Sequence, residues 1–294
     1  MTIKFFKPVL LALLLVFAAC PVKGEAAELN QPYSTWLWDT AAIVEKPDDV
    51  IQFLADKQAD QLYLQIDQSL PAAVYQSFIE KANSSGVKVQ ALDGAPKWAT
   101  AKGEAAMLSF FSWVSSYQEQ AAPAQQFSGI HLDIEPYLLP GWESNYKNTV
   151  VNYQTRMLQA ASLSAELQLP LGADIPFWFD EMMFSNKFGK DSLAGWIIKN
   201  TDSVTIMAYR DTAAGPNGMI ELSRNEVELA ARYGKQIQIA AETGATSEAA
   251  YITFYEEGTA RMEEQLSLVR DAYSADSHVS FAVHHLQSWM DMKP

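Results

Sequence analysis

Apolar and polar positions alternate in eight short runs along the chain, and longer amphipathic runs separate them. Alternation with a period of two is typical of a β-strand, whereas apolar residues three and four apart indicate a helix. The predicted strands are residues 34–40, 61–67, 87–94, 129–136, 170–177, 203–210, 235–243 and 278–285. Helices are predicted between them, for example over residues 71–84 and 262–273.

This order predicts an α/β protein, a (β/α)₈ TIM barrel that forms a single domain, because eight strand–helix units in about 255 residues match that fold. Gly86 and Gly234 stand just before predicted strands, where a left-handed glycine commonly ends a helix. An open doubly wound sheet is the alternative. The G-x-G-x-x-G turn and the P-loop, which would bind a nucleotide in such a sheet, do not occur in the sequence.

The N-terminus has the pattern of a targeting segment. Lys4 and Lys7 precede an apolar run over residues 9–19, which is about as long as a signal-peptide core and short for a membrane span. We therefore expect a signal peptide or lipoprotein leader over residues 1–27 and a barrel domain over residues 28–294. The protein is expected to be secreted or to be a bacterial cell-envelope lipoprotein.

The end of the leader allows two forms of export. Residues 16–20, "VFAAC", resemble a bacterial lipobox, in which Cys20 would carry the lipid. Cleavage after Ala26 would instead release a soluble protein. Cys20 is the only cysteine, so the sequence excludes a disulfide within the chain and a thiol nucleophile in the barrel.

The chain is acidic, with a formal net charge of −14 at pH 7. Nucleic acid and anionic lipid carry the same sign of charge, so neither is an expected partner. Contact with a membrane is expected only through a lipid on Cys20. We expect a monomer that binds an oligosaccharide or polysaccharide and needs no cofactor.

The predicted strand over residues 129–136 carries a row of ionisable groups. Its even-numbered positions are aliphatic from 130 to 134, and its odd-numbered positions are His131, Asp133 and Glu135. In a barrel the two rows face the helices and the interior respectively. Glu135 should lie nearest the carboxyl end of the strand, where active sites of these barrels form, with Asp133 roughly 6.6 Å below it. Two close, buried acids cannot both ionise at low cost, so a raised pKa is expected.

Acidic and aromatic residues also end the other predicted strands. They are Trp38, Asp67, Asp93, Asp174, Tyr209, Asp211 and Glu242, and Trp289 follows the last strand. Aromatic rings stack on the apolar faces of sugars, while carboxylates bind the hydroxyl groups. Together with His131, these residues predict a carbohydrate site.

The strand that contains Glu135 resembles a family signature. Residues 128–135, "SGIHLDIE", are similar to the Asp-Gly-x-Asp-x-Asp-x-Glu motif of family 18 glycoside hydrolases, the chitinase and endo-β-N-acetylglucosaminidase group, and Gly129, Asp133 and Glu135 match it. The resemblance implies that Glu135 is the general acid/base. It also implies that Asp133 orients the N-acetyl group of the substrate, whose carbonyl oxygen acts as the nucleophile.

Two further segments extend the resemblance. Residues 207–211, "MAYRD", are similar to a Met-x-Tyr-Asp segment of the family, in which the tyrosine, here Tyr209, holds the acetamido group. The family places an aromatic residue after the last strand as the floor of the sugar pocket, and Trp289 is the nearest candidate. Ser128 and His131 stand where the family motif has its first two aspartates.

Two alternatives remain open. Many retaining glycosidases pair an acid/base glutamate on the fourth strand with a nucleophilic glutamate on the seventh, which here would be Glu135 and Glu242 with their carboxyl groups about 5–5.5 Å apart. The other alternative is a lectin-like barrel that binds carbohydrate without cleaving it.

Metal binding is the weaker interpretation of the histidines. His131 could join Asp133 and Asp174 around a divalent ion, but no H-x-H or H-E-x-x-H spacing supports this. The neighbours His284 and His285 are expected to face opposite sides of a strand. We therefore expect no metal site.

Overall fold

Eight parallel strands close into a barrel in the computed structural model, which describes residues 32–294. The strands follow one another around the barrel in the order β1-β2-β3-β4-β5-β8-β9-β10, and β10 pairs with β1. Their bounds are β1 (Tyr33–Leu37), β2 (Ala59–Gln65), β3 (Lys88–Asp93), β4 (Gly129–Leu132), β5 (Leu171–Pro176), β8 (Ser203–Met207), β9 (Gln236–Glu242) and β10 (Val279–His284). The predicted barrel and its eight strands are confirmed. The leader and Cys20 lie outside the described residues.

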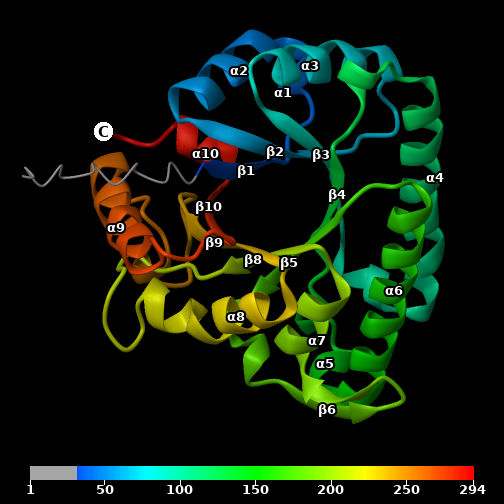
Figure 1. The fold of residues 1–294 in the computed structure, drawn as a ribbon, viewed down its shortest axis with the longest axis vertical. Coiled ribbons are helices and arrows are strands. Elements are labelled where there is room, and N and C mark those ends of the chain that lie inside the picture. Colours follow the sequence, from blue (N-terminus) through cyan, green and yellow to red (C-terminus); the bar gives the residue numbers. More distant parts are fainter. Residues whose placement is uncertain (1–31) are drawn as a thin grey trace, which may run out of the picture. The chain divides into compact units, whose positions relative to one another are not determined.

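Helices surround this ring of strands (Figure 1). The helices are α1 (Ala42–Glu45), α2 (Pro47–Asp56), α3 (Ala72–Ser84), α4 (Glu104–Gln120), α5 (Gly141–Ser144), α6 (Tyr146–Glu166), α7 (Leu193–Asn200), α8 (Met219–Tyr233), α9 (Thr259–Ala272) and α10 (Leu286–Met290). The predicted helices over residues 71–84 and 262–273 correspond to α3 and α9. Gly86 and Gly234 have φ angles of 84° and 66°, so both adopt the left-handed conformation expected after a helix. No helix among residues 32–294 is long and apolar enough to cross a membrane.

The structure also contains a hairpin that the sequence pattern did not predict. The strands β6 (Met183–Asn186) and β7 (Gly189–Ser192) pair in antiparallel fashion between β5 and α7. Most of their side chains are polar and at least partly exposed, so the segment lacks the apolar alternation that marks a half-buried strand.

The barrel has two separate apolar cores. The larger core lies between the strands and the helices and contains Ile130, Leu132 and Ile134, as expected. A smaller core fills the barrel interior and consists of Trp36, Tyr63, Leu92, Ala240 and Ala282. The interior is therefore packed with apolar side chains, as is usual for barrels of this kind.

Candidate active site

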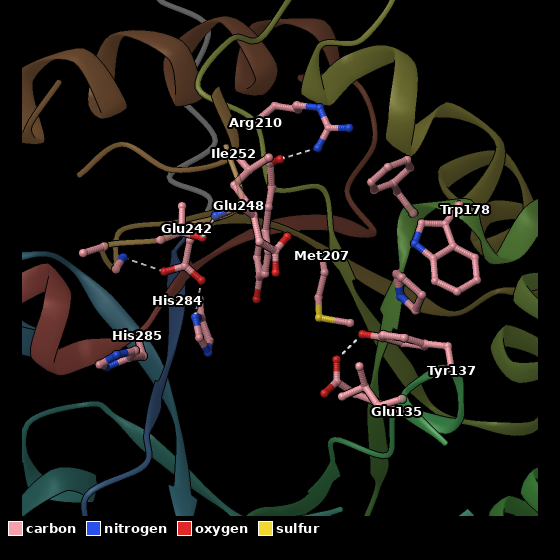
Figure 2. Close-up of a pocket in the computed structure, with 17 residues that line it drawn as sticks. Glu135, Tyr137, Trp178, Met207, Arg210, Glu242, Glu248, Ile252, His284 and His285 are labelled. Atoms are coloured by element: carbon pink, nitrogen blue, oxygen red, sulfur yellow. Dashed lines mark hydrogen bonds and ion pairs between the residues drawn. The ribbon is translucent and has the colours of Figure 1, made fainter. Parts of the chain in front are cut away.

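A pocket of about 590 Å³ opens at the carboxyl ends of the strands. Ligand sites commonly have volumes of roughly 300–1,000 Å³. Glu135 and Tyr137 lie on one side of this pocket, and Glu242 and His284 lie on the other (Figure 2). Three of the four predicted catalytic residues line it, namely Glu135, Tyr209 and Glu242.

Glu135 is held by a tyrosine two residues further along the chain. Pro136–Leu138 forms a short 3₁₀ turn directly after Glu135. Within this turn the hydroxyl of Tyr137 donates a hydrogen bond to Oε1 of Glu135 (Figure 2). Burial raises the pKa of Glu135, and the negative charge of Asp174 raises it further, while the Tyr137 hydrogen bond acts in the opposite direction. Tyr137 is a site residue that the sequence pattern did not predict, although it belongs to the same short stretch as Glu135.

Asp133 lies one layer below Glu135. Burial, Asp174 and Glu135, in that order, raise the pKa of Asp133 well above its usual value. Its Oδ1 is buried and has no hydrogen-bond partner. The end of β3 packs so closely here that a Cβ on Gly94 would lie 2.0 Å from the carbonyl oxygen of Asp133. The backbone beneath the site is therefore tightly constrained.

His131 and Asp174 are sealed below the pocket, which corrects their prediction as substrate-binding residues. The Nε2 of His131 lies 2.8 Å from Oδ1 of Asp174, and the indole N–H of Trp36 donates to Oδ2 at 2.9 Å. Tyr63 stacks on the His131 ring with 3.7 Å between the centroids. Both residues are buried, so this ionisable pair is enclosed by protein and cannot touch a ligand.

A second carboxylate–histidine pair forms the opposite wall. Oε1 of Glu242 accepts the backbone N–H groups of Thr243 at 2.8 Å and Gly244 at 2.6 Å, and Oε2 lies 2.7 Å from Nδ1 of His284. The indole N–H of Trp38 points at Nε2 of His284 at 3.0 Å. An indole N–H can only donate, so Nε2 must accept and Nδ1 must carry the proton that bonds Glu242. This tautomer is assigned from the partners.

Trp38 therefore acts through His284 and is not itself among the pocket-lining residues. His284 and His285 both line the pocket, which corrects the expectation that they face opposite ways. The peptide bond between them is cis, and their rings meet edge to face with centroids 5.2 Å apart. No group of three His, Cys, Asp or Glu side chains among residues 32–294 is arranged to hold a metal ion.

Three predicted binding aspartates lie away from the pocket lining. Asp67 is exposed and accepts hydrogen bonds from the backbone and hydroxyl of Ser69, so it shapes a turn. Asp93 is half-buried and accepts the Gln65 amide at 3.2 Å. Asp211 donates its backbone N–H to the carbonyl oxygen of Tyr251. Position at a strand end therefore did not suffice to bring these side chains into the pocket.

The prediction that Trp289 forms the floor of the pocket is wrong. Its side chain is only 1% exposed and belongs to the core between the strands and the helices. The Trp289 ring packs edge to face on Tyr33 and Phe53, with centroid distances of 5.6 and 5.3 Å. The aromatic side chains that do line the pocket are Tyr137, Phe177, Trp178 and Tyr209.

Comparison with known proteins supports the barrel at the level of its fold. No family model matches the chain, and no curated protein matches its sequence. The crystal structure of the spore cortex-lytic enzyme SleL from Bacillus megaterium QM B1551 superposes with a TM-score of 0.52 at 12% identity, over 88% of this chain and 72% of that chain. The chain shares the barrel fold of this enzyme.

Two further solved structures are similar to this chain. A beta-glycosidase from Pyrococcus horikoshii has a TM-score of 0.52 at 10% identity, over 87% of this chain and 83% of that chain. A GH18 chitinase from Cycas revoluta in complex with (GlcNAc)3 has a TM-score of 0.48 at 12% identity, over 88% of this chain and 96% of that chain. At these identities the likeness is one of fold alone.

Proposed function

We propose that this protein is a glycoside hydrolase that cleaves a cell-wall or extracellular glycan with retention, with Glu135 as the general acid/base. The observation that carries this proposal is a partly buried carboxyl group with a raised pKa at the mouth of the barrel, inside a pocket of about 590 Å³. A carboxyl group that keeps its proton toward neutral pH can protonate the leaving oxygen of a glycosidic bond.

Substrate assistance is the mechanism that we favour. In this proposal Asp133 orients the acetamido group of the sugar, whose carbonyl oxygen attacks the anomeric carbon while Glu135 protonates the leaving group. The Oδ1 of Asp133 is buried without a hydrogen-bond partner below Glu135, so this proposal requires the Asp133 carboxyl group to turn toward the pocket when substrate binds. Tyr209 lines the pocket. The family resemblance implies that its hydroxyl group holds the acetamido group of the sugar.

Glu242 is the less suitable nucleophile. Its carboxylate already accepts two backbone N–H groups and the His284 ring. These three donors stabilise the negative charge and reduce its tendency to attack carbon. We therefore propose that Glu242 and His284 position sugar hydroxyl groups from the opposite wall.

A panel of defined oligosaccharides tests the function. We expect the wild-type protein to cleave substrates that contain 2-acetamido sugars and Glu135→Gln to lower turnover by a factor of 10² or more, because Gln cannot donate a proton in this role. Glu143→Gln, at an exposed position of α5, is the matched control and should retain full turnover. Wild-type turnover in Glu135→Gln would refute the assignment.

Two inhibitors separate the mechanisms. A thiazoline mimic of the cyclised acetamido intermediate should inhibit a substrate-assisted enzyme. A 2-fluoro sugar should instead become attached to Glu242 if that residue is the nucleophile, and mass spectrometry would detect the adduct. Equilibrium binding of the panel without release of reducing ends would favour the lectin-like alternative, which the replacement of two family aspartates by Ser128 and His131 keeps open.

We further propose that the protein acts outside the cytoplasm, as a secreted protein or as a lipoprotein anchored through Cys20. The leader over residues 1–27 supports this proposal. Intact-mass analysis of protein purified from its native host would distinguish a diacylglyceryl group on Cys20 from cleavage near Ala26. Recovery of the uncleaved chain from the cytoplasm would contradict both forms.

A further inference from the structure

Arg210 gives the pocket a positive charge whose purpose the proposed chemistry does not explain. It is three residues beyond the end of β8 and lines the pocket. Figure 2 places it at the edge of the pocket, well separated from Glu135. It is the only Lys or Arg among the residues that line this pocket.

The guanidinium group is held in place from several sides. One terminal nitrogen donates to the carbonyl oxygen of Tyr209 at 2.6 Å, and the other donates to the side-chain oxygen of Asn217 at 3.1 Å. The rings of Phe177 and Tyr251 lie 4.9 and 5.3 Å from its central carbon. These contacts restrict the Arg210 side chain before any ligand arrives, which lowers the entropic cost of using it for binding.

The charge of Arg210 is nevertheless unmatched. No carboxylate lies within ion-pair distance of Arg210 in the part of the chain that the structure describes, although Asp211 is its neighbour in sequence. Its Nε–H is buried and has no hydrogen-bond partner. Burial lowers the pKa of Arg210, which reports the cost of removing this cation from water. A guanidinium group has five N–H donors, and only two have protein acceptors here.

We propose that Arg210 binds a carboxylate group of the substrate, so that the preferred glycan is one whose sugars carry an acidic substituent. This inference rests on the proposed function of the same pocket, and it adds the class of substrate. A carboxylate suits the site because the planar guanidinium group can donate two parallel hydrogen bonds to it. Trp178 also lines this pocket and is partly exposed, so its ring can stack on a sugar ring.

The acidic groups of the pocket do not prevent this binding. The raised pKa of Glu135 favours its neutral form, and Glu242 is compensated by three N–H donors. Glu248 is the third acid that lines the pocket, and it is exposed, so water and salt screen its charge. Arg210 also lies apart from Glu135 in Figure 2, so a carboxylate bound there would belong to a sugar next to the cleavage point. Repulsion from Glu135 is therefore small at that position.

Calorimetric titration provides the test. The acidic ligand is a tetrasaccharide that alternates N-acetylglucosamine with N-acetylmuramic acid and carries free lactyl carboxylates. The neutral comparison ligand is the same tetrasaccharide with these carboxylates converted to methylamides. The Glu135→Gln protein binds each ligand without turnover. We expect the acidic ligand to bind at least tenfold more tightly, and this ratio to fall to about 1 when Arg210→Met is added.

Two controls exclude indirect effects. Arg261→Met removes an exposed arginine of α9 that pairs with Glu264, and it should leave the tenfold ratio unchanged. Arg210→Lys keeps the charge and should restore part of the preference. Melting temperatures of all variants check that the fold persists. Equal binding of the two ligands by Glu135→Gln, no binding of either, or a ratio that survives in Arg210→Met would overturn the inference.

The outcome is independent of the proposed catalysis. If the wild-type protein cleaves no member of the oligosaccharide panel, these tetrasaccharides included, while the tenfold preference is observed, the hydrolase proposal fails and the role of Arg210 stands. If the wild-type protein cleaves neutral 2-acetamido oligosaccharides and shows no preference for the acidic ligand, the hydrolase proposal stands and the role of Arg210 fails.

Discussion

Glu226, which is not among the residues that line the proposed site, makes the stability of this barrel depend on pH. It lies on the buried face of α8 and is fully buried, and neither of its carboxyl oxygens has a hydrogen-bond partner. Burial raises its pKa from 4.5 to about 9, and the nearby negative charge of Asp180 contributes to the increase. At pH 7 the folded protein therefore holds a proton on Glu226 that the unfolded chain has released.

The size of the effect follows from the pKa values. The contribution is fully present below pH 4.5, the ordinary pKa, and it is lost as the pH rises toward about 9. Each pH unit in this interval lowers the free energy of unfolding by about 1.4 kcal/mol. From pH 4.5 to pH 7 the loss amounts to about 3 kcal/mol, which is a large part of the stability of a typical domain.

Glu226→Gln removes this dependence because the amide does not ionise. At each pH we subtract the free energy of unfolding of the wild type from that of the variant. We expect this difference to be about 3 kcal/mol more favourable to the variant at pH 7 than at pH 4. Urea unfolding followed by circular dichroism at both pH values measures this. Glu228→Gln, at an exposed position of the same helix, is the control. Parallel pH curves for wild-type and Glu226→Gln would refute the reasoning.

Two further predictions concern the neighbourhood of the site. Tyr137→Phe removes the hydrogen bond that lowers the pKa of Glu135, so the alkaline limb of the pH–rate profile should move to higher pH, and an unchanged limb would contradict this. Gly172→Ala should lower the free energy of unfolding by about 1–3 kcal/mol, because the new Cβ would lie 2.6 Å from Nδ1 of His131. Wild-type stability of that variant in urea would show that the interior can adjust.

The alternation of side chains made the barrel predictable. The period of two fixed the strands, and on β4 it also assigned Ile130, Leu132 and Ile134 to the outer core and His131 to the interior. These assignments depend only on local geometry and on the requirement that each face of a strand is buried against its own layer. The same reasoning placed Glu135 at the mouth.

Residues beyond the strand ends were harder to predict, because turns decide where they point. Trp289 follows the last strand by several residues, and α10 directs its ring outward onto Tyr33 and Phe53. Tyr137, by contrast, is turned back onto Glu135 by a 3₁₀ turn. Neither direction is encoded in a periodic pattern, so the strands were predicted well and the lining of the pocket only in part.

The bond between Tyr137 and Glu135 has a stereochemical consequence. Because the phenolic hydrogen occupies Oε1, the proton of a neutral Glu135 belongs on Oε2. Oε2 is then the one oxygen atom of Glu135 that can donate a proton to an incoming acceptor. In the proposed mechanism, the turn that follows Glu135 would therefore decide which oxygen atom delivers the proton to the leaving group.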